Sequence, residues 1–161
     1  MTLYHGSNVV VKEPRIKNSF RTLDFGKGFY TTSSFEQAKN WAIRKAQNEK
    51  AGSPIISEYF VHDDFLTDKN FSILIFEKAN DDWLDFVISN RTNPKFTYDY
   101  DIVKGAVAND RVYASINAYE SGFMDKNTLL KELKTWVYVD QILFHTEKSL
   151  SLLTFKKEIK I

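Results

Sequence analysis

Two short stretches near the start of the sequence combine residue types that are suited to holding a ligand. Tyr4-His5-Gly6-Ser7 joins an imidazole to a glycine that permits close backbone approach and to a hydroxyl that can hydrogen-bond. On its own, this tetrapeptide favours a structural histidine. The second stretch, Asp24 to Thr32, sets two glycines around a lysine before aromatic residues and paired threonines. Tyr30 is suited to stack on a planar ring, and the alternative is a hairpin entry with Phe29 in the core.

A third stretch lies near the end of the chain, where Asp140 and Gln141 begin an apolar run that ends at Thr146 and Glu147. Other chemistries are excluded by what the sequence lacks. There is no phosphate-binding loop with Gly-Lys-Ser/Thr, and the segment 26–28 precedes a strand rather than a helix, unlike a dinucleotide-binding fingerprint. No serine lies in a nucleophile elbow. The adjacent acids at 63–64 and 81–82 are typical of a solvated turn or helix start.

Four helices are predicted to support these stretches. The strongest begins at Ser33, which has capping-box spacing to Glu36. Its apolar face has helical spacing and comprises Phe35, Ala38, Trp41, Ala42 and Ala46. The other three are predicted from a cap at Asn80 to Arg91, from a cap at Asn109 or Asp110 to Gly122, and over 129–133 with a cap at Asn127 or Thr128.

Short strands are predicted between the helices, at 3–4, 29–32, 55–61, 71–76, 101–108, 136–139, 141–146 and 150–155. The tail over 156–161 is expected to extend an edge strand. Residues 8–28 are predicted to form a long irregular connection. Strands and helices follow one another without a regular alternation, which indicates an α+β fold. The length predicts a single domain over residues 1–161.

Composition limits the chemistry further. The 161 residues include no cysteine, which excludes disulfides, thiol catalysis and cysteine-based metal sites. The three histidines (His5, His62 and His145) are far apart in the sequence, so we expect no metal site; His62 and His145 are interpreted as structural. No run of 18 apolar residues and no secretory signal is present, so we expect a cytoplasmic protein that does not contact a membrane.

The net charge of +1 conceals an uneven distribution. Residues 1–50 carry nine Lys or Arg against four Asp or Glu, whereas residues 51–110 carry five against eleven. If the first third folds onto one face, that face is suited to attract an anion such as a dinucleotide. The alternative is a solvated surface of uneven charge.

In their order along the chain, the three stretches resemble the ADP-ribosyltransferase superfamily, in the branch of diphtheria toxin and the poly(ADP-ribose) polymerases. That branch carries a histidine on the first strand, a tyrosine on the second and a glutamate or substitute at the start of a later strand. More closely, the sequence is similar to a family of small bacterial proteins known as a domain of unknown function and grouped with that fold. The matching segments are 3–7, 24–32 and 140–147, with a weaker match over 101–110.

The resemblance implies an ADP-ribosyltransferase-like split antiparallel β-sheet core with flanking helices that binds NAD. His5 would hydrogen-bond the 2′-hydroxyl of the adenosine ribose, Gly6 would meet the nicotinamide carboxamide through its backbone, and Ser7 would support that turn. Tyr30 would stack on the nicotinamide ring. The residues implied beside the nicotinamide ribose are Thr31 and Thr32.

Gln141 matches the position that is glutamate in the best-studied members. That glutamate stabilises the positive charge that develops on the ribose when nicotinamide leaves. A neutral amide can orient the 2′-hydroxyl but cannot offset the charge, which argues against polymer synthesis and leaves single transfer or hydrolysis open. Of the neighbouring acids, Asp140 faces the opposite side of the strand, and Glu147 lies about 20 Å along it.

The resemblance therefore implies an NAD-dependent mono-ADP-ribosyltransferase that needs no metal. It is expected to act on an unidentified acceptor (protein, nucleic acid or small molecule), as the toxin or effector of a two-component system with a small inhibitor protein. The alternatives are an NAD glycohydrolase, or a weakly active or inactive module that binds NAD or ADP-ribose. A nucleic-acid-binding protein that uses the basic first third is disfavoured by the near-neutral total charge.

Overall fold

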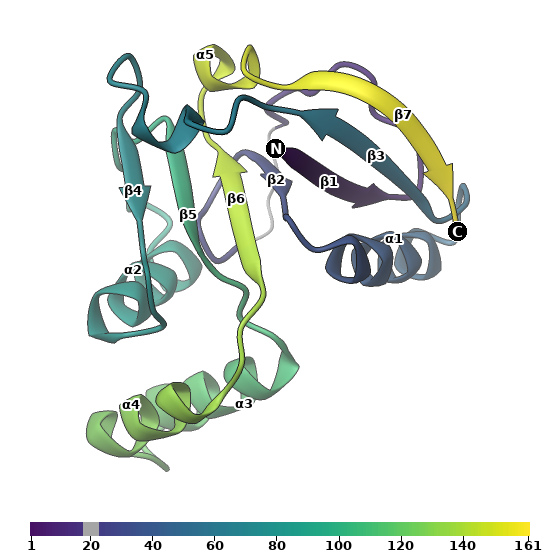
Figure 1. The fold of residues 1–161 in the computed structure, drawn as a ribbon. Helices are drawn as coiled ribbons and strands as arrows, with labels where there is room; N and C mark the ends of the chain where they lie inside the picture. Colours follow the sequence, from purple (N-terminus) through teal and green to yellow (C-terminus); the bar gives the residue numbers. More distant parts are fainter. Residues whose placement is uncertain (18–22) are drawn as a thin grey trace.

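A computed structural model of the chain describes residues 1–17 and 23–161. Its seven strands are, in chain order, β1 (Thr2–Ser7), β2 (Phe29–Thr31), β3 (Ile55–Phe60), β4 (Ile73–Ile75), β5 (Ile102–Ala106), β6 (Asp140–Phe144) and β7 (Thr154–Lys160). The helices are α1 (Phe35–Glu49), α2 (Asp81–Thr92), α3 (Asp110–Glu120), α4 (Lys126–Thr135) and α5 (Glu147–Leu150), with a 3-10 turn η1 (Phe65–Thr67) (Figure 1). The predicted α+β class is confirmed.

The strands form two sheets with the orders β1-β3-β7 and β2-β6-β5-β4. Neighbouring strands are antiparallel except for β4 and β5, which run parallel and depart from the wholly antiparallel core that was expected. Two backbone hydrogen bonds join the sheets: Tyr4 N donates to Thr32 O at 2.9 Å, and Thr32 N donates to Tyr4 O at 3.0 Å. These bonds hold the end of β2 beside the middle of β1, which brings two of the three sequence stretches together.

Apolar side chains cover both faces of the second sheet, as the two-residue period of a strand requires. Ile102 and Ile142 belong to a buried cluster shared with the first sheet, whereas Val103 and Leu143 belong to a cluster shared with α2, α3 and α4. Gln141 lies two residues before Leu143, so its side chain projects from the same face of β6, the face toward the helices. In Figure 1, α3 and α4 lie together below the sheets, and α1 lies against the first sheet.

A polar side chain caps the N-terminus of each of the four longer helices. Asn80 caps α2 as predicted, and Asn109 caps α3, the first of the two residues predicted as candidates. The cap of α1 is Ser34, whose hydroxyl accepts from Gln37 N at 3.2 Å, rather than the predicted Ser33. The predicted cap of α4 at Asn127 or Thr128 is also wrong, since the cap is Asp125. Adjacent polar residues can each cap a helix, so the sequence alone does not separate them.

The strand predictions are least accurate in two segments. Residues 71–76 contain only the short edge strand β4, which is half-buried or exposed rather than buried. Residues 136–139 form no strand: Tyr138 instead packs on Trp83 and donates its hydroxyl to Leu133 O at 2.7 Å. Of the predicted strand 150–155, Leu150 ends α5 and β7 begins at Thr154. The tail joins β7, an edge strand as predicted.

Candidate active site

The close packing of β1 against α1 sets one wall of the site. A Cβ added at Gly6 would lie 1.9 Å from the carbonyl oxygen of Ala38 and 2.8 Å from the nitrogen of Ala42. Only glycine therefore lets the helix backbone approach the strand this closely. Ala38 and Ala42 are fully buried, and their small side chains serve the same contact. The neighbouring residue His5 is thereby fixed beside the helix.

His5 is held in one orientation by its ring nitrogen and its ring face. Its Nδ1 lies 2.7 Å from the carbonyl oxygen of Tyr30, so Nδ1 carries the proton and donates it, and Nε2 remains an acceptor. The ring stacks on Phe29, with centroids 4.3 Å apart. The pKa of His5 is lowered to about 4, mainly by burial; the hydrogen bond to Tyr30 O opposes this shift, and the positive charges of Lys45 and Lys17 add to it. His5 is thus a neutral hydrogen-bond acceptor at physiological pH.

Tyr30 closes the loop that precedes β2. Its hydroxyl donates to Gly26 O at 2.6 Å and accepts from Phe25 N at 3.1 Å. Gly26 has a φ of +80°, a conformation that favours glycine. Burial raises the pKa of the Tyr30 hydroxyl well above its usual value, and the Asp24 carboxylate adds to that shift. The phenol therefore stays protonated, and its hydrogen bonds fix the loop.

Gln141 and Asp24 meet on the helix side of β6. Gln141 is 3% exposed, and its Nε2 donates to Asp24 Oδ2 at 2.9 Å and to Ala106 O at 3.1 Å. Asp24 also accepts from Ala108 N at 3.2 Å and from the hydroxyl of Tyr113. Burial raises the pKa of the Asp24 carboxyl, and the hydrogen bonds from Tyr113, Gln141 and Ala108 oppose that shift. Both amide hydrogens of Gln141 are committed, so its oxygen is the group that can accept from a ligand.

These residues line one cavity of about 380 Å³ between α1 and the start of α3. His5 and Gly6 come from β1, Tyr30 from β2 and Gln141 from β6. The wall formed by α1 is polar and comprises Gln37, Asn40, Trp41, Arg44, Lys45 and Asn48. The volume lies in the range of small-molecule and cofactor sites, about 300–1,000 Å³.

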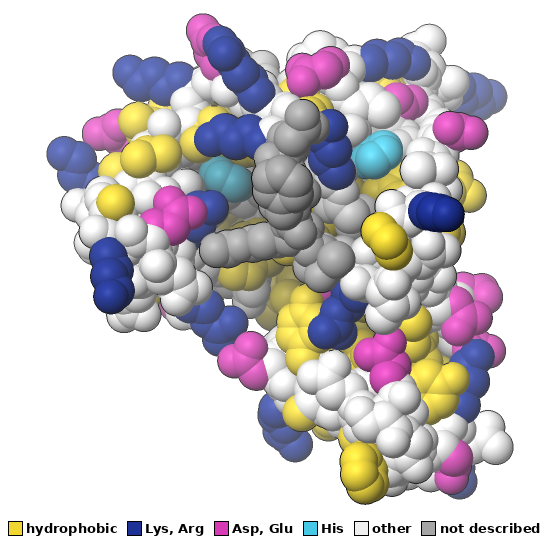
Figure 2. All heavy atoms as spheres, turned by 180° about the vertical axis from the view of Figure 1, so that it is seen from behind, with side chains coloured by type: hydrophobic (Ala, Val, Ile, Leu, Met, Phe, Trp, Pro, Cys, Tyr) yellow, Lys and Arg dark blue, Asp and Glu magenta, His cyan; other side chains and the backbone are white. Residues whose placement is uncertain are grey.

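Two cations on α1 give this wall a positive character. Arg44 Nη2 lies 3.1 Å from Asp110 Oδ2 at the start of α3, and Lys45 Nζ lies 2.8 Å from Glu49 Oε1. The Arg44 pair is largely exposed and the Lys45 pair partly exposed, so both contribute little to stability and leave the cations available to a bound anion. Lys and Arg side chains are frequent over the α1 part of the face seen in Figure 2.

Three of the residues expected to bind the ligand lie outside the cavity lining. Ser7 is buried and donates to Asn8 Oδ1 at 3.4 Å. The hydroxyl of Thr31 donates to Ile142 O at 3.0 Å, and that of Thr32 donates to Asp140 O at 2.8 Å. The two threonine hydroxyls link the end of β2 to β6 and so help to hold Tyr30 and Gln141 in position.

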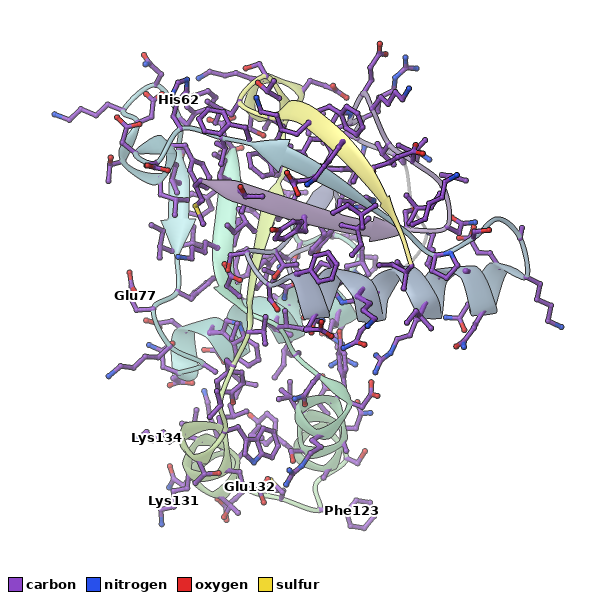
Figure 3. The ribbon with its side chains drawn as sticks, turned by 45° about the vertical axis from the view of Figure 1, so that its right-hand side comes forward. His62, Glu77, Phe123, Lys131, Glu132 and Lys134 are labelled. Carbon is purple, nitrogen blue, oxygen red and sulfur yellow. The ribbon has the colours of Figure 1, made fainter. Side chains whose placement is uncertain are left out.

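The other two histidines also lie outside the cavity. His145 Nδ1 lies 2.6 Å from Lys27 O, and its ring stacks on Tyr98 with centroids 4.4 Å apart. His62 is exposed between β3 and η1, at the opposite end of the molecule from α3 and α4 in Figure 3. Within residues 1–17 and 23–161, no group of three or more His, Asp or Glu side chains is placed to hold a metal ion. None of the helices described is long and apolar enough to cross a lipid bilayer.

Comparison with known protein families identifies the family of this chain. The profile of the family described as "Protein of unknown function (DUF3990)" matches residues 1–155. The chain belongs to the DUF3990 family. No curated protein and no solved structure matches it. The match includes every cavity residue described above, from His5 on β1 to Gln141 on β6.

Several cavity residues of this DUF3990 protein were not among the predicted site residues. Asp24 lies in the matched stretch 24–32, but no role was assigned to it. The polar wall of α1 has helical spacing through Gln37, Asn40, Arg44 and Asn48. This spacing was present in the sequence, but only the apolar face of the helix was considered there. Trp41, which was assigned to that apolar face, is half-buried and lines the cavity.

Proposed function

We propose that this protein binds NAD in the cavity between α1 and α3 and acts as a mono-ADP-ribosyltransferase. The observation that carries the proposal is the convergence of three distant segments. His5, Tyr30 and Gln141 come from three strands separated by up to 136 positions along the chain, yet they line one cavity. Convergence of a few polar side chains from distant segments on one cavity is typical of a ligand site.

The chemistry of the lining suits each part of NAD. The neutral imidazole of His5 offers Nε2 as an acceptor for a ribose hydroxyl, and the ring of Tyr30 offers an aromatic surface. Arg44 and Lys45 offer positive charge to the diphosphate. Gln141 offers its side-chain oxygen to a second hydroxyl.

In the proposed reaction, the bond between ribose C1′ and the nicotinamide nitrogen breaks and its electron pair leaves with nicotinamide. The positive charge thereby moves from the pyridinium ring to the ribose. The lone pair of an acceptor oxygen or nitrogen then forms a new bond to C1′, and the acceptor loses its proton to solvent. With water as the acceptor, the same steps give hydrolysis to ADP-ribose.

The test is incubation of the protein with NAD labelled in the adenylate part, in the presence of a bacterial lysate. We expect label on a macromolecule, and we expect His5→Ala to abolish it. His62→Ala is the matched control, because that imidazole is exposed and lies outside the cavity. Labelling by His5→Ala equal to that of the control variant would refute the proposal.

A second candidate function is favoured by the uncharged Gln141 at the cavity wall. Release of nicotinamide without a labelled macromolecule would identify an NAD glycohydrolase. Binding of NAD without release of nicotinamide would identify a binding module. A role as a toxin or effector with a small inhibitor protein, the cytoplasmic location and the single domain over 1–161 stay predictions.

A further inference from the structure

Asp24 is a buried acid in the wall of the proposed NAD cavity. It is 5% exposed and lines the cavity beside Gln141. Its two oxygens receive three hydrogen bonds, from the Tyr113 hydroxyl, from Ala108 N at 3.2 Å and from Gln141 Nε2 at 2.9 Å. A buried carboxyl is rare unless it is paired or used, and here its partners come from α3 (Tyr113), from the segment before α3 (Ala108) and from β6 (Gln141).

Burial raises the pKa of the Asp24 carboxyl, whereas the hydrogen-bond donors around it favour its charged form. A backbone N–H and an amide N–H can only donate, so Ala108 and Gln141 both require an acceptor at Oδ2. Arg91 lies behind the cavity wall, with its Cζ 4.0 Å from the centre of the Tyr113 ring, and its charge opposes the effect of burial on the Asp24 pKa. The carboxylate is thus stabilised by three donors and one nearby cation.

We propose that Asp24 supplies the negative charge that Gln141 lacks. This inference rests on the proposed function. The Gln141 oxygen orients a ribose hydroxyl, while the adjacent Asp24 carboxylate stabilises the positive charge that moves onto the ribose as the C1′–nitrogen bond breaks. The two residues together replace one glutamate: Asp24 carries the charge, and Gln141 makes the oriented contact with the ribose hydroxyl. In a site shielded from water, a charge fixed in this way acts more strongly than it would in solution.

The other acids near the cavity are not placed for this role. Asp110 lines the cavity, but its side chain is 78% exposed and is paired with Arg44. The Oδ1 of Asp140 accepts from the hydroxyl of Ser33 at 2.7 Å, and Asp140 lies outside the cavity lining. Among the described residues that line the cavity, Asp24 is the buried acid.

The test measures NAD affinity and nicotinamide release for three variants. Asp24→Asn removes the charge and preserves the shape, so we expect the turnover rate to fall by about 10²–10³-fold, the effect of losing one preorganised electrostatic contact. NAD affinity is expected to change by less than about threefold, because the charge acts in the transition state. The double variant Asp24→Asn/Gln141→Glu exchanges acid and amide and should recover at least about tenfold in rate over the single variant.

Asp101→Asn is the matched control. Asp101 is also a largely buried acid, since its side chain is 16% exposed and its Oδ1 accepts from the Thr146 hydroxyl at 2.7 Å, but it lies outside the cavity. Its variant should release nicotinamide at the wild-type rate per folded molecule. A rate loss equal to that of Asp24→Asn would show a general structural effect and would overturn the inference.

The outcomes separate this inference from the proposed function. A folded Asp24→Asn that turns over NAD at the wild-type rate, while His5→Ala does not, overturns the role of Asp24 and leaves the proposed function standing. A wild-type protein that neither binds NAD nor releases nicotinamide overturns both. If Asp24→Asn fails to fold, the carbon-13 shift of the Asp24 carboxyl in the wild-type protein at neutral pH decides. A carboxylate shift supports the inference, and a carboxylic acid shift overturns it.

Discussion

Replacing Gly6 with alanine is expected to damage the fold and the site together. The new Cβ would lie 1.9 Å from Ala38 O, whereas an ordinary contact begins at 3.4 Å, so the backbone of α1 must move away from β1 by about 1.5 Å. Overpacking of this kind costs about 1–3 kcal/mol. Because α1 also carries Arg44 and Lys45, the shift displaces one cavity wall relative to His5, and we expect weaker NAD binding as well.

Urea unfolding followed by circular dichroism measures the first effect, and calorimetric titration with NAD measures the second. Gly122→Ala is the control, because Gly122 has a φ of +81° and a Cβ there would meet nothing within 4 Å. That variant should lose about 1 kcal/mol through backbone strain alone and keep its NAD affinity. A Gly6→Ala protein with stability within about 0.5 kcal/mol of wild type would refute the packing argument.

Three further predictions concern the cavity. The pKa of His5 lies at about 4 in the folded protein against 6.5 for an unperturbed histidine, so the stability contributed by neutral His5 is present above about pH 6.5 and is lost as the pH falls toward 4. His5→Gln should flatten that part of a plot of urea midpoint against pH. Tyr30→Phe removes the hydroxyl that bonds Gly26 O and Phe25 N and should cost about 1–2 kcal/mol, measured as a lower thermal midpoint. Arg44→Ala breaks an exposed ion pair and should change stability by less than about 0.5 kcal/mol, yet it should weaken NAD binding at low salt and reduce the salt dependence of the affinity.

The sequence was most informative where local chemistry determines local structure. Asn80 was identified as a cap because it precedes a helical period, and Asn109 was one of two candidates beside Asp110 for the same reason. Ser33 and Ser34 are both able to cap α1, and the sequence alone does not choose between them. In the fold, the Ser33 hydroxyl donates to Asp140 on the distant strand β6, which leaves Ser34 as the cap. The strand predicted over 136–139 failed for a similar reason: its aromatic residues pack on α2 and α4 rather than pairing in a sheet.

The candidate site was predictable in part. His5, Tyr30 and Gln141 were identified through the family resemblance that their three stretches carry, and the structure brings them to one cavity. The resemblance implied that Ser7, Thr31 and Thr32 lie at the ligand, but the two threonine hydroxyls bond the neighbouring strand and the Ser7 hydroxyl bonds Asn8. The pairing of Asp24 with Gln141 spans 117 residues, so no local pattern reveals it.

NAD is proposed to bind in the cavity between α1 and α3. Calorimetric titration of the purified protein with NAD tests this proposal, with His5→Ala and His62→Ala measured alongside. We predict a single site with a dissociation constant of about 1 mM or tighter, an affinity at least about tenfold weaker for His5→Ala and an unchanged affinity for His62→Ala. The absence of binding by the wild-type protein, or equal affinities for the two variants, would contradict the claim.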